Sequence, residues 1–140
     1  MDRAAILYPM FIMIIMTLVV VYRQFFITKK LVRLKVIRLS YFKLFKAEYD
    51  IPNELEAVRM QYRNMFEVPL LFYVLSLFLY FSNNVLAIDL ILAWCFVGGR
   101  FAHFLIRIFH YDDVMIRFNC FAFSVIAITV HWLLVIVRFW

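Results

Sequence analysis

The chain contains little glycine, proline and cysteine, with 2, 3 and 2 residues among 140. So little glycine, beside a hydrophobic fraction of 67%, is far from the composition of a soluble globular protein. Cys95 and Cys120 both fall inside long hydrophobic runs, where they predict ordinary packing and no disulfide framework. The sequence also lacks a nucleotide-binding loop and a serine–histidine triad pattern. No histidine or cysteine pair has ligand spacing, so we predict no metal site.

Long hydrophobic runs dominate what is present, and the mean hydropathy is +0.91. Each run is near the roughly 20 residues that a helix needs to cross a bilayer. The first is read as a retained helix because a basic segment follows it. We therefore predict an all-α fold, an integral membrane four-helix bundle that forms one domain over 1–140. The predicted spans are 4–22, 58–81, 86–108 and 114–139.

The charge of the chain is uneven, with 15 basic and 9 acidic residues and a net charge of +6. Much of the excess falls in the predicted first connection. These residues are Arg23, Lys29, Lys30, Arg33, Lys35, Arg38, Lys43 and Lys46. The positive-inside rule explains this cluster better than nucleic-acid binding does, and predicts contact with anionic lipid on the cytoplasmic side. Both chain ends then lie outside, and the segment 31–45 is expected to lie in the membrane interface.

Polar side chains gather at the start of the second predicted span. Arg59, Arg63 and Glu67 are spaced by four residues and Asn64 adjoins Arg63, so all four fall on one side of a helix. Charge inside a bilayer is costly and by default indicates a functional site; the alternative is an interhelical salt bridge that only holds the bundle together. Glu67 would orient the arginines or bind an ammonium group.

A second polar face lies on the third predicted span, where Arg100, His103 and Arg107 share one side. Arg23 ends the first span at the same membrane level, and Arg117 opens the fourth. Several guanidinium groups in a partly dry site would bind an acidic ligand from the cytoplasm. For Arg23 and Arg117 the alternative is snorkelling to lipid head groups. For His103 the alternatives are a proton carrier and a hydrogen-bonded interior side chain.

Other polar residues give weaker signals. Asp89 is near the outer end of the third span, where we expect it to cap the helix or to be solvated. His131 is a lone polar group on an apolar fourth helix. The pair Gly98 and Gly99 predicts close approach of a neighbouring helix, within the bundle or in an oligomer.

These motifs together resemble the MAPEG family, the membrane-associated proteins in eicosanoid and glutathione metabolism. The stretch Arg63-Asn64-Met-Phe-Glu67 is similar to the Arg-Asn-x-x-Glu pattern on the second helix of the family. Gly99-Arg100-x-x-His103 is similar to its Gly-Arg-x-x-His pattern on the third. The resemblance covers most of the chain, and Tyr41-Phe42-Lys43-Leu44 looks most like the short bacterial members.

This resemblance implies a homotrimer that binds glutathione between neighbouring subunits near the cytoplasmic side. For a bacterial member it implies the inner membrane, with both chain ends periplasmic. Arg117 is the candidate for stabilising a glutathione thiolate. The expected ligand-binding residues are Arg23, Arg59, Arg63, Asn64, Glu67, Arg100, His103 and Arg107.

The sequence also departs from the prostaglandin E synthase branch of the family. An arginine expected three positions before Arg63 is Met60 here, and the tyrosine one turn after the family histidine is Arg107. Phe118 and Phe121 stand where that branch has a serine and a tyrosine. The next hydroxyl along the helix, Ser124, is further in.

Two functions remain open from the sequence. The first is a glutathione-dependent transferase or peroxidase acting on lipophilic electrophiles or lipid hydroperoxides, where a lowered thiol pKa supplies the attacking thiolate. The second is a non-catalytic member of the family that binds a lipid head group or another acidic ligand, or is a structural partner of other membrane proteins. The missing hydroxyls favour the second.

Overall fold

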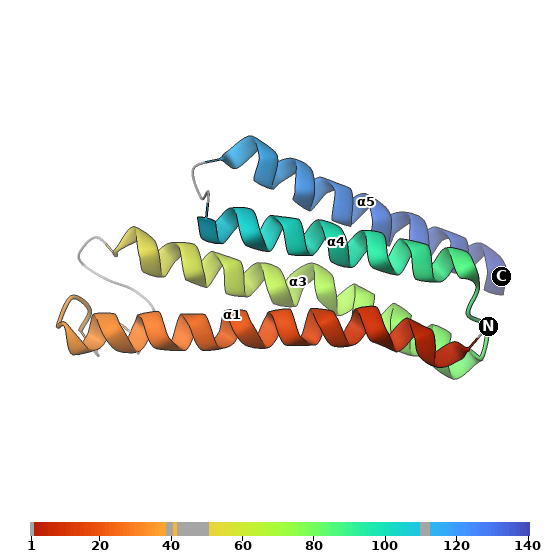
Figure 1. Ribbon diagram of the computed structural model, residues 1–140, viewed down its shortest axis with the longest axis horizontal. Helices are drawn as coiled ribbons and strands as arrows, with labels where there is room; N and C mark the ends of the chain where they lie inside the picture. The colour runs from red at the N-terminus through yellow and green to blue at the C-terminus, as the bar shows by residue number, and fades with distance from the viewer. Residues whose placement is uncertain (1, 39–40, 42–50, 110–112) are drawn as a thin grey trace. The chain divides into compact units, whose positions relative to one another are not determined.

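The computed structural model describes residues 2–38, 41, 51–109 and 113–140. A short 3-10 helix, η1 (Arg3–Ile6), precedes the long helices α1 (Leu7–Arg33), α3 (Asn53–Ser82), α4 (Ala87–Phe109) and α5 (Val114–Phe139). Each long helix is long and apolar enough to cross a membrane, and no strand occurs in the described ranges. The predicted all-α fold class with four long helices is confirmed, as Figure 1 shows.

Helix α1 is longer than its hydrophobic run, because it continues to Arg33. The prediction that placed Arg23, Lys29, Lys30 and Arg33 in a connection was therefore wrong. Residues 23–33 contain no glycine or proline, and lysine, arginine, glutamine and leucine favour helix, so polarity alone does not end it. Lys43, Lys46 and the other residues of 39–40 and 42–45 in the segment 31–45 lie outside the described residues.

A backbone turn ends α1. The amide of Val36 donates to the carbonyl of Leu31 at 3.0 Å, and the amide of Lys35 donates to the carbonyl of Val32 at 3.0 Å. Lys35 has a φ of 57°, in the left-handed region that helix C-termini commonly use. The last carbonyl groups of α1 are thus satisfied by the backbone.

Helix α3 begins directly after Pro52, whose carbonyl accepts from the amides of Leu55 and Glu56. Glu54 and Glu56 stand in its first turn, where carboxylates favour the positive end of the helix dipole. The helix continues through Pro69.

The chain divides into two compact units. One consists of Met1–Met16 and Glu67–Trp140, and the other of Thr17–Phe66. We describe each by itself.

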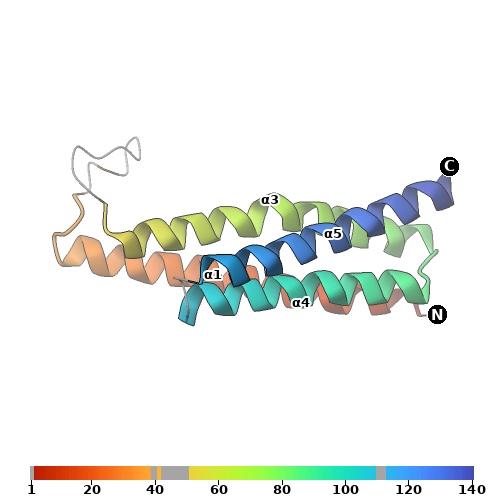
Figure 2. The ribbon, with the colours of Figure 1, turned by 90° about the horizontal axis from the view of Figure 1, so that it is seen from above.

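In the first unit, α4 and α5 lie side by side and run antiparallel, as Figures 1 and 2 show. Gly99 permits their close approach, since a Cβ there would lie 2.9 Å from Phe123 Cδ1 and 3.2 Å from the carbonyl oxygen of Cys120. A Cβ on Gly98 would meet nothing within 4 Å. The second part of α3 packs on α4 through the stacked rings of Phe72 and Phe96, with centroids 4.6 Å apart.

In the second unit, residues that follow α1 pack back on it. Leu31, Ile37, Tyr41 and Leu55 form a buried cluster. This cluster joins the end of α1 to the start of α3, and it occupies only one side of α1. It also leaves the opposite side of the helix end exposed, where Lys29, Lys30 and Arg33 stand.

Candidate functional site

Arg100 is the most unusual side chain of α4, because it carries a charge yet is only 1% exposed. Its Nε and both terminal nitrogens are buried and have no hydrogen-bond partner among the described residues. The guanidinium carbon lies 5.6 Å from the ring centroid of Phe96 and 5.1 Å from that of Phe121. Aromatic faces attract a cation but accept no conventional hydrogen bond, so the donor capacity of this group remains available for a ligand.

Other ionisable groups of the same unit act electrostatically on Arg100 or on His103. Glu67 and Tyr73, both on α3, interact with Arg100 electrostatically. His103 is buried on α4, and its ring centroid lies 5.9 Å from that of Phe121. The charges of Arg100, Arg107 and Arg117 all act on this histidine. We name this group the Arg100 cluster. Its members are Glu67, Tyr73, Arg100, His103, Arg107 and Arg117.

The remaining predicted site residues belong to the second unit. Arg23 donates to Gln61 Oε1 at 2.8 Å. Arg59 hydrogen-bonds to the hydroxyl of Tyr41 and lies 5.6 Å from the centroid of its ring. On α3, Arg63 is exposed and Asn64 is half-buried. That these four residues share one site with the Arg100 cluster stays a prediction.

Sequence reasoning missed two polar residues near these groups. Gln61 is 2% exposed, and its Nε2 has no hydrogen-bond partner among the described residues. An amide between Arg59 and Arg63 in a predicted span was the available signal. Tyr73 is the second, a phenol of α3 that acts electrostatically on Arg100.

The structure shows which partner the hydroxyl group of Ser124 on α5 has. Ser124 is fully buried, and its hydroxyl donates to the carbonyl oxygen of Phe121 at 2.7 Å within its own helix. Phe121 itself packs against Arg100 and His103. The Ser124 hydroxyl is thus used within α5, whereas the Tyr73 hydroxyl acts electrostatically on Arg100.

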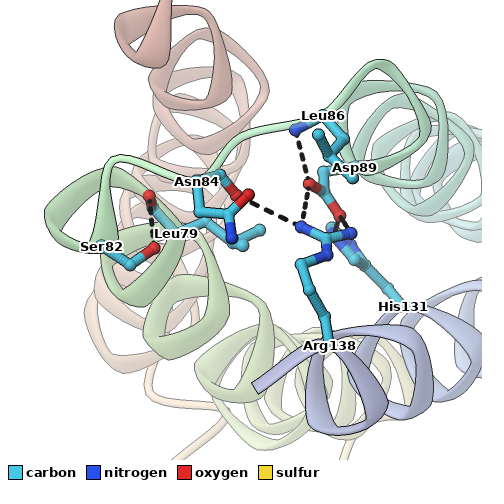
Figure 3. A network of polar contacts seen from close by, with 7 residues as sticks. All are labelled: Leu79, Ser82, Asn84, Leu86, Asp89, His131 and Arg138. Carbon is cyan, nitrogen blue, oxygen red and sulfur yellow. Dashed lines mark hydrogen bonds and ion pairs between the residues drawn. The ribbon is translucent and has the colours of Figure 1, made fainter.

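A second set of polar residues lies around Asp89, which stands in the first turn of α4, as Figure 3 shows. Its Oδ2 accepts from the amide of Leu86 at 2.8 Å and from Arg138 at 2.8 Å. Its Oδ1 accepts from Arg138 at 3.0 Å and lies 3.2 Å from Nε2 of His131. Arg138 also donates to the carbonyl oxygen of Asn84 at 3.2 Å. We name these residues the Asp89 network.

The Asp89 network decides between the two expectations for Asp89 and corrects the expectation for His131. Asp89 caps α4 as predicted, but it is 0% exposed and not solvated. His131 is not a lone polar group, because it contacts this carboxylate. Each carboxylate oxygen has two partners, which leaves little capacity for a ligand. The network therefore joins the start of α4 to the last turns of α5 and is separate in role from the Arg100 cluster.

Comparison with known proteins agrees with this architecture. The model of the MAPEG family matches residues 4–137. No curated protein and no solved structure matches the chain.

Proposed function

Because this chain belongs to the MAPEG family of multi-pass membrane proteins, we propose that it is a glutathione-dependent transferase or peroxidase acting on lipophilic electrophiles or lipid hydroperoxides. The observation that carries the proposal is the buried guanidinium of Arg100, whose three nitrogens have no hydrogen-bond partner among the described residues. A buried cation in this condition is strongly destabilised unless something pairs with it. An anionic ligand would supply that partner, and glutathione offers two carboxylates and a thiolate.

In the proposed site, each charged residue of the Arg100 cluster has a different role toward glutathione. Arg100 holds an anionic group of glutathione in a charge-assisted hydrogen bond. Glu67 binds the ammonium group of the ligand or orients Arg100. His103 forms one wall of the site against Phe121. Arg23, Arg59, Arg63, Asn64 and Arg107 complete the set of ligand-binding residues.

Arg117 is the candidate catalytic residue. It stands in the first turns of α5, and its charge reaches His103. A guanidinium beside the glutathione sulfur favours the thiolate over the thiol. In conjugation the thiolate forms a carbon–sulfur bond and the leaving group departs with its electron pair. In the peroxidase reaction two glutathione molecules give a disulfide, and the hydroperoxide becomes an alcohol and water. Tyr73 is the available phenol for donating a proton or a hydrogen bond.

An apolar hollow at the start of α5 supports a lipophilic substrate. Its volume is about 590 Å³. It is lined by Asp113, Val114, Met115, Ile116 and Phe118. Its mainly apolar walls suit a substrate that partitions into the bilayer.

Exposed charge on α3 supports an oligomer. Arg63 and Glu67 are both exposed in the single chain, although they stand on a helix that is apolar enough to span a membrane. Lipid is a poor environment for such groups. We propose a homotrimer of one-domain subunits in which a neighbouring subunit covers this face, in a bacterial inner membrane with both chain ends periplasmic.

The second candidate function is non-catalytic binding of another acidic ligand, such as a lipid head group, or a structural role beside other membrane proteins. The commitment of the Ser124 hydroxyl to its own helix favours it. Phe118 and Phe121 also bring no hydroxyl near the cluster. The same guanidinium groups would bind a phosphate or carboxylate without activating a thiol.

Calorimetry with reduced glutathione and the detergent-purified protein tests the proposal. We expect saturable binding, weakened about tenfold or more in Arg63→Ala and in Glu67→Ala, because each substitution removes a charged hydrogen-bonding group. Lys35→Ala is the matched control and should bind normally, since Lys35 is exposed beyond the end of α1. No saturation at millimolar glutathione would contradict the proposal. Equal binding of glycerol phosphate would support the non-catalytic alternative.

A further inference from the structure

One exposed side of α1 carries aliphatic side chains first, then aromatic and then basic side chains along the chain. Leu18 and Val19 are 49% and 46% exposed, and Tyr22 and Phe26 are 60% and 62% exposed. Lys29, Lys30 and Arg33 follow, all exposed, with Leu34 after them. Spacings of three and four residues place these side chains on one side of the helix. We name them the α1 stripe.

An open hollow lies at the basic end of the α1 stripe. Phe26, Lys29, Lys30, Arg33 and Leu34 line this hollow, which has a volume of about 600 Å³. The three cations therefore surround a space that has an aromatic ring and a leucine on its walls. A phosphate group and the glycerol next to it would contact charge and hydrocarbon there at the same time.

Among the described residues, the contacts that cap and pack the end of α1 do not involve the side chains of these cations. The last carbonyl groups of the helix accept from the amides of Leu34, Lys35 and Val36. The opposite side of the helix is occupied, because Leu31 is buried against Ile37. The cations of the stripe are thus left on the outer side of a helix end that is already capped and packed.

We propose that the α1 stripe binds one anionic phospholipid, with its phosphate between Lys30 and Arg33 and its acyl chains along Tyr22, Val19 and Leu18. Leu18 to Lys30 spans about 18 Å at 1.5 Å per residue. This is close to half of a hydrocarbon core of about 30 Å. Phe26, four residues before Lys30, then falls near the interface level, where aromatic rings are enriched, and Tyr22 lies deeper beside the acyl chains.

The chemistry of the stripe selects among lipids. Arg33 can bind a phosphodiester through two nitrogens, and the lysines add point charges. A zwitterionic lipid would bring an ammonium group toward these cations, whereas phosphatidylglycerol brings only hydroxyl groups. The apolar half of the stripe distinguishes this surface from a site for free phosphate. The inference does not depend on the glutathione proposal, because it uses other residues.

Native mass spectrometry of the delipidated protein, titrated with phosphatidylglycerol or phosphatidylcholine, tests the inference. We expect one saturable phosphatidylglycerol per chain, and clearly weaker phosphatidylcholine. Arg33→Gln should weaken phosphatidylglycerol binding about fivefold, and Lys30→Gln with Arg33→Gln about thirtyfold, because each surface cation contributes similarly to anionic-lipid attraction. Lys35→Gln, which removes the same charge outside this hollow, is the matched control and should have little effect.

Three outcomes would overturn it. Equal affinity for the two lipids would remove the anionic selectivity. Equal losses in Arg33→Gln and Lys35→Gln would reduce the effect to general electrostatic attraction. Displacement of the lipid by millimolar inorganic phosphate would show a phosphate site without an acyl contribution. Glutathione calorimetry on the same variants should be unchanged under the proposal, which separates a failure here from a failure of the proposed function.

Discussion

Asp89 is a carboxylate on a membrane-spanning helix with no exposed surface. Such a group is tolerated only when its charge is balanced and its oxygens are hydrogen-bonded. Arg138 supplies two parallel hydrogen bonds to it, the geometry that a guanidinium and a carboxylate form best. His131 contacts the same carboxylate from one side. The stability of the α4–α5 pair should therefore depend on Asp89, the one acidic residue of these two helices.

Asp89→Asn should lower the thermal stability of the protein strongly, because it leaves Arg138 without its counter-ion at nearly unchanged side-chain volume. Breaking a buried pair from one side costs about 3 kcal/mol or more. His131→Gln should cost about 1 kcal/mol, the value of a typical hydrogen bond. The unfolding midpoint in detergent measures both. Asp113→Asn, at an exposed carboxylate, is the control.

Adding Arg138→Gln to Asp89→Asn should restore part of the loss, because the unpaired charge disappears as well. Glutathione affinity should stay normal in these variants, since Asp89 lies about 17 Å along α4 from Arg100. A loss no larger than that of Asp113→Asn would show that the ion pair does not hold the helices together.

At the scale of the helix, Gly99 sets the distance between α4 and α5. A methyl group there would lie 2.9 Å from a ring carbon of Phe123 and 3.1 Å from Cβ of Ser124. The backbone carbonyl of Cys120 is also close, at 3.2 Å, and cannot rotate away as a side chain can. Arg100 follows directly in the sequence, so a shift of α5 would also move Phe121 relative to the guanidinium.

Gly99→Ala should destabilise the protein by about 1–3 kcal/mol through overpacking, reduced by the better helix propensity of alanine. Gly98→Ala is the matched control and should be neutral or stabilising by up to about 1 kcal/mol, since nothing lies within 4 Å of its added Cβ. Unfolding midpoints of the two variants provide the comparison. Equal midpoints would mean that α4 and α5 separate without cost.

The four long helices of the described residues were predictable from the sequence, because a membrane span needs a long apolar run, and α5 matches its run at both ends. The end of α1 was not predictable in this way. Hydropathy reports the bilayer boundary, whereas a helix ends where its backbone hydrogen bonding ends. The basic residues before Arg33 allow the helix to continue.

Helical spacing also predicted that Arg100 and His103 share a face, because both residues stand on the same helix and their relative orientation follows from its geometry. The partners of Asp89 lie 42 and 49 residues away on another helix. Periodicity within one helix contains no information about such a pairing. For the same reason, contact between the Arg100 cluster and Arg63 stays a prediction.

At the scale of the whole molecule, the chain is a MAPEG family member with four helices long and apolar enough to span a membrane, and the proposed thiol reaction assigns a role to its charged residues. The family match over residues 4–137 supports the membership of nearly the entire chain. If subunits share the site, the active species is the trimer, and the mass of the detergent-solubilised complex must be determined on the same preparation that is assayed.

The most direct measurement is glutathione-dependent turnover of an aryl halide and of a fatty-acid hydroperoxide by the purified protein, for the wild type, Arg117→Ala and Lys35→Ala. We expect rates that saturate with glutathione for at least one substrate. Arg117→Ala should lower kcat about a hundredfold, because it removes a charge that stabilises the developing thiolate. Lys35→Ala should match the wild type. Glutathione binding without turnover of either substrate, or an unchanged rate in Arg117→Ala, would contradict the account.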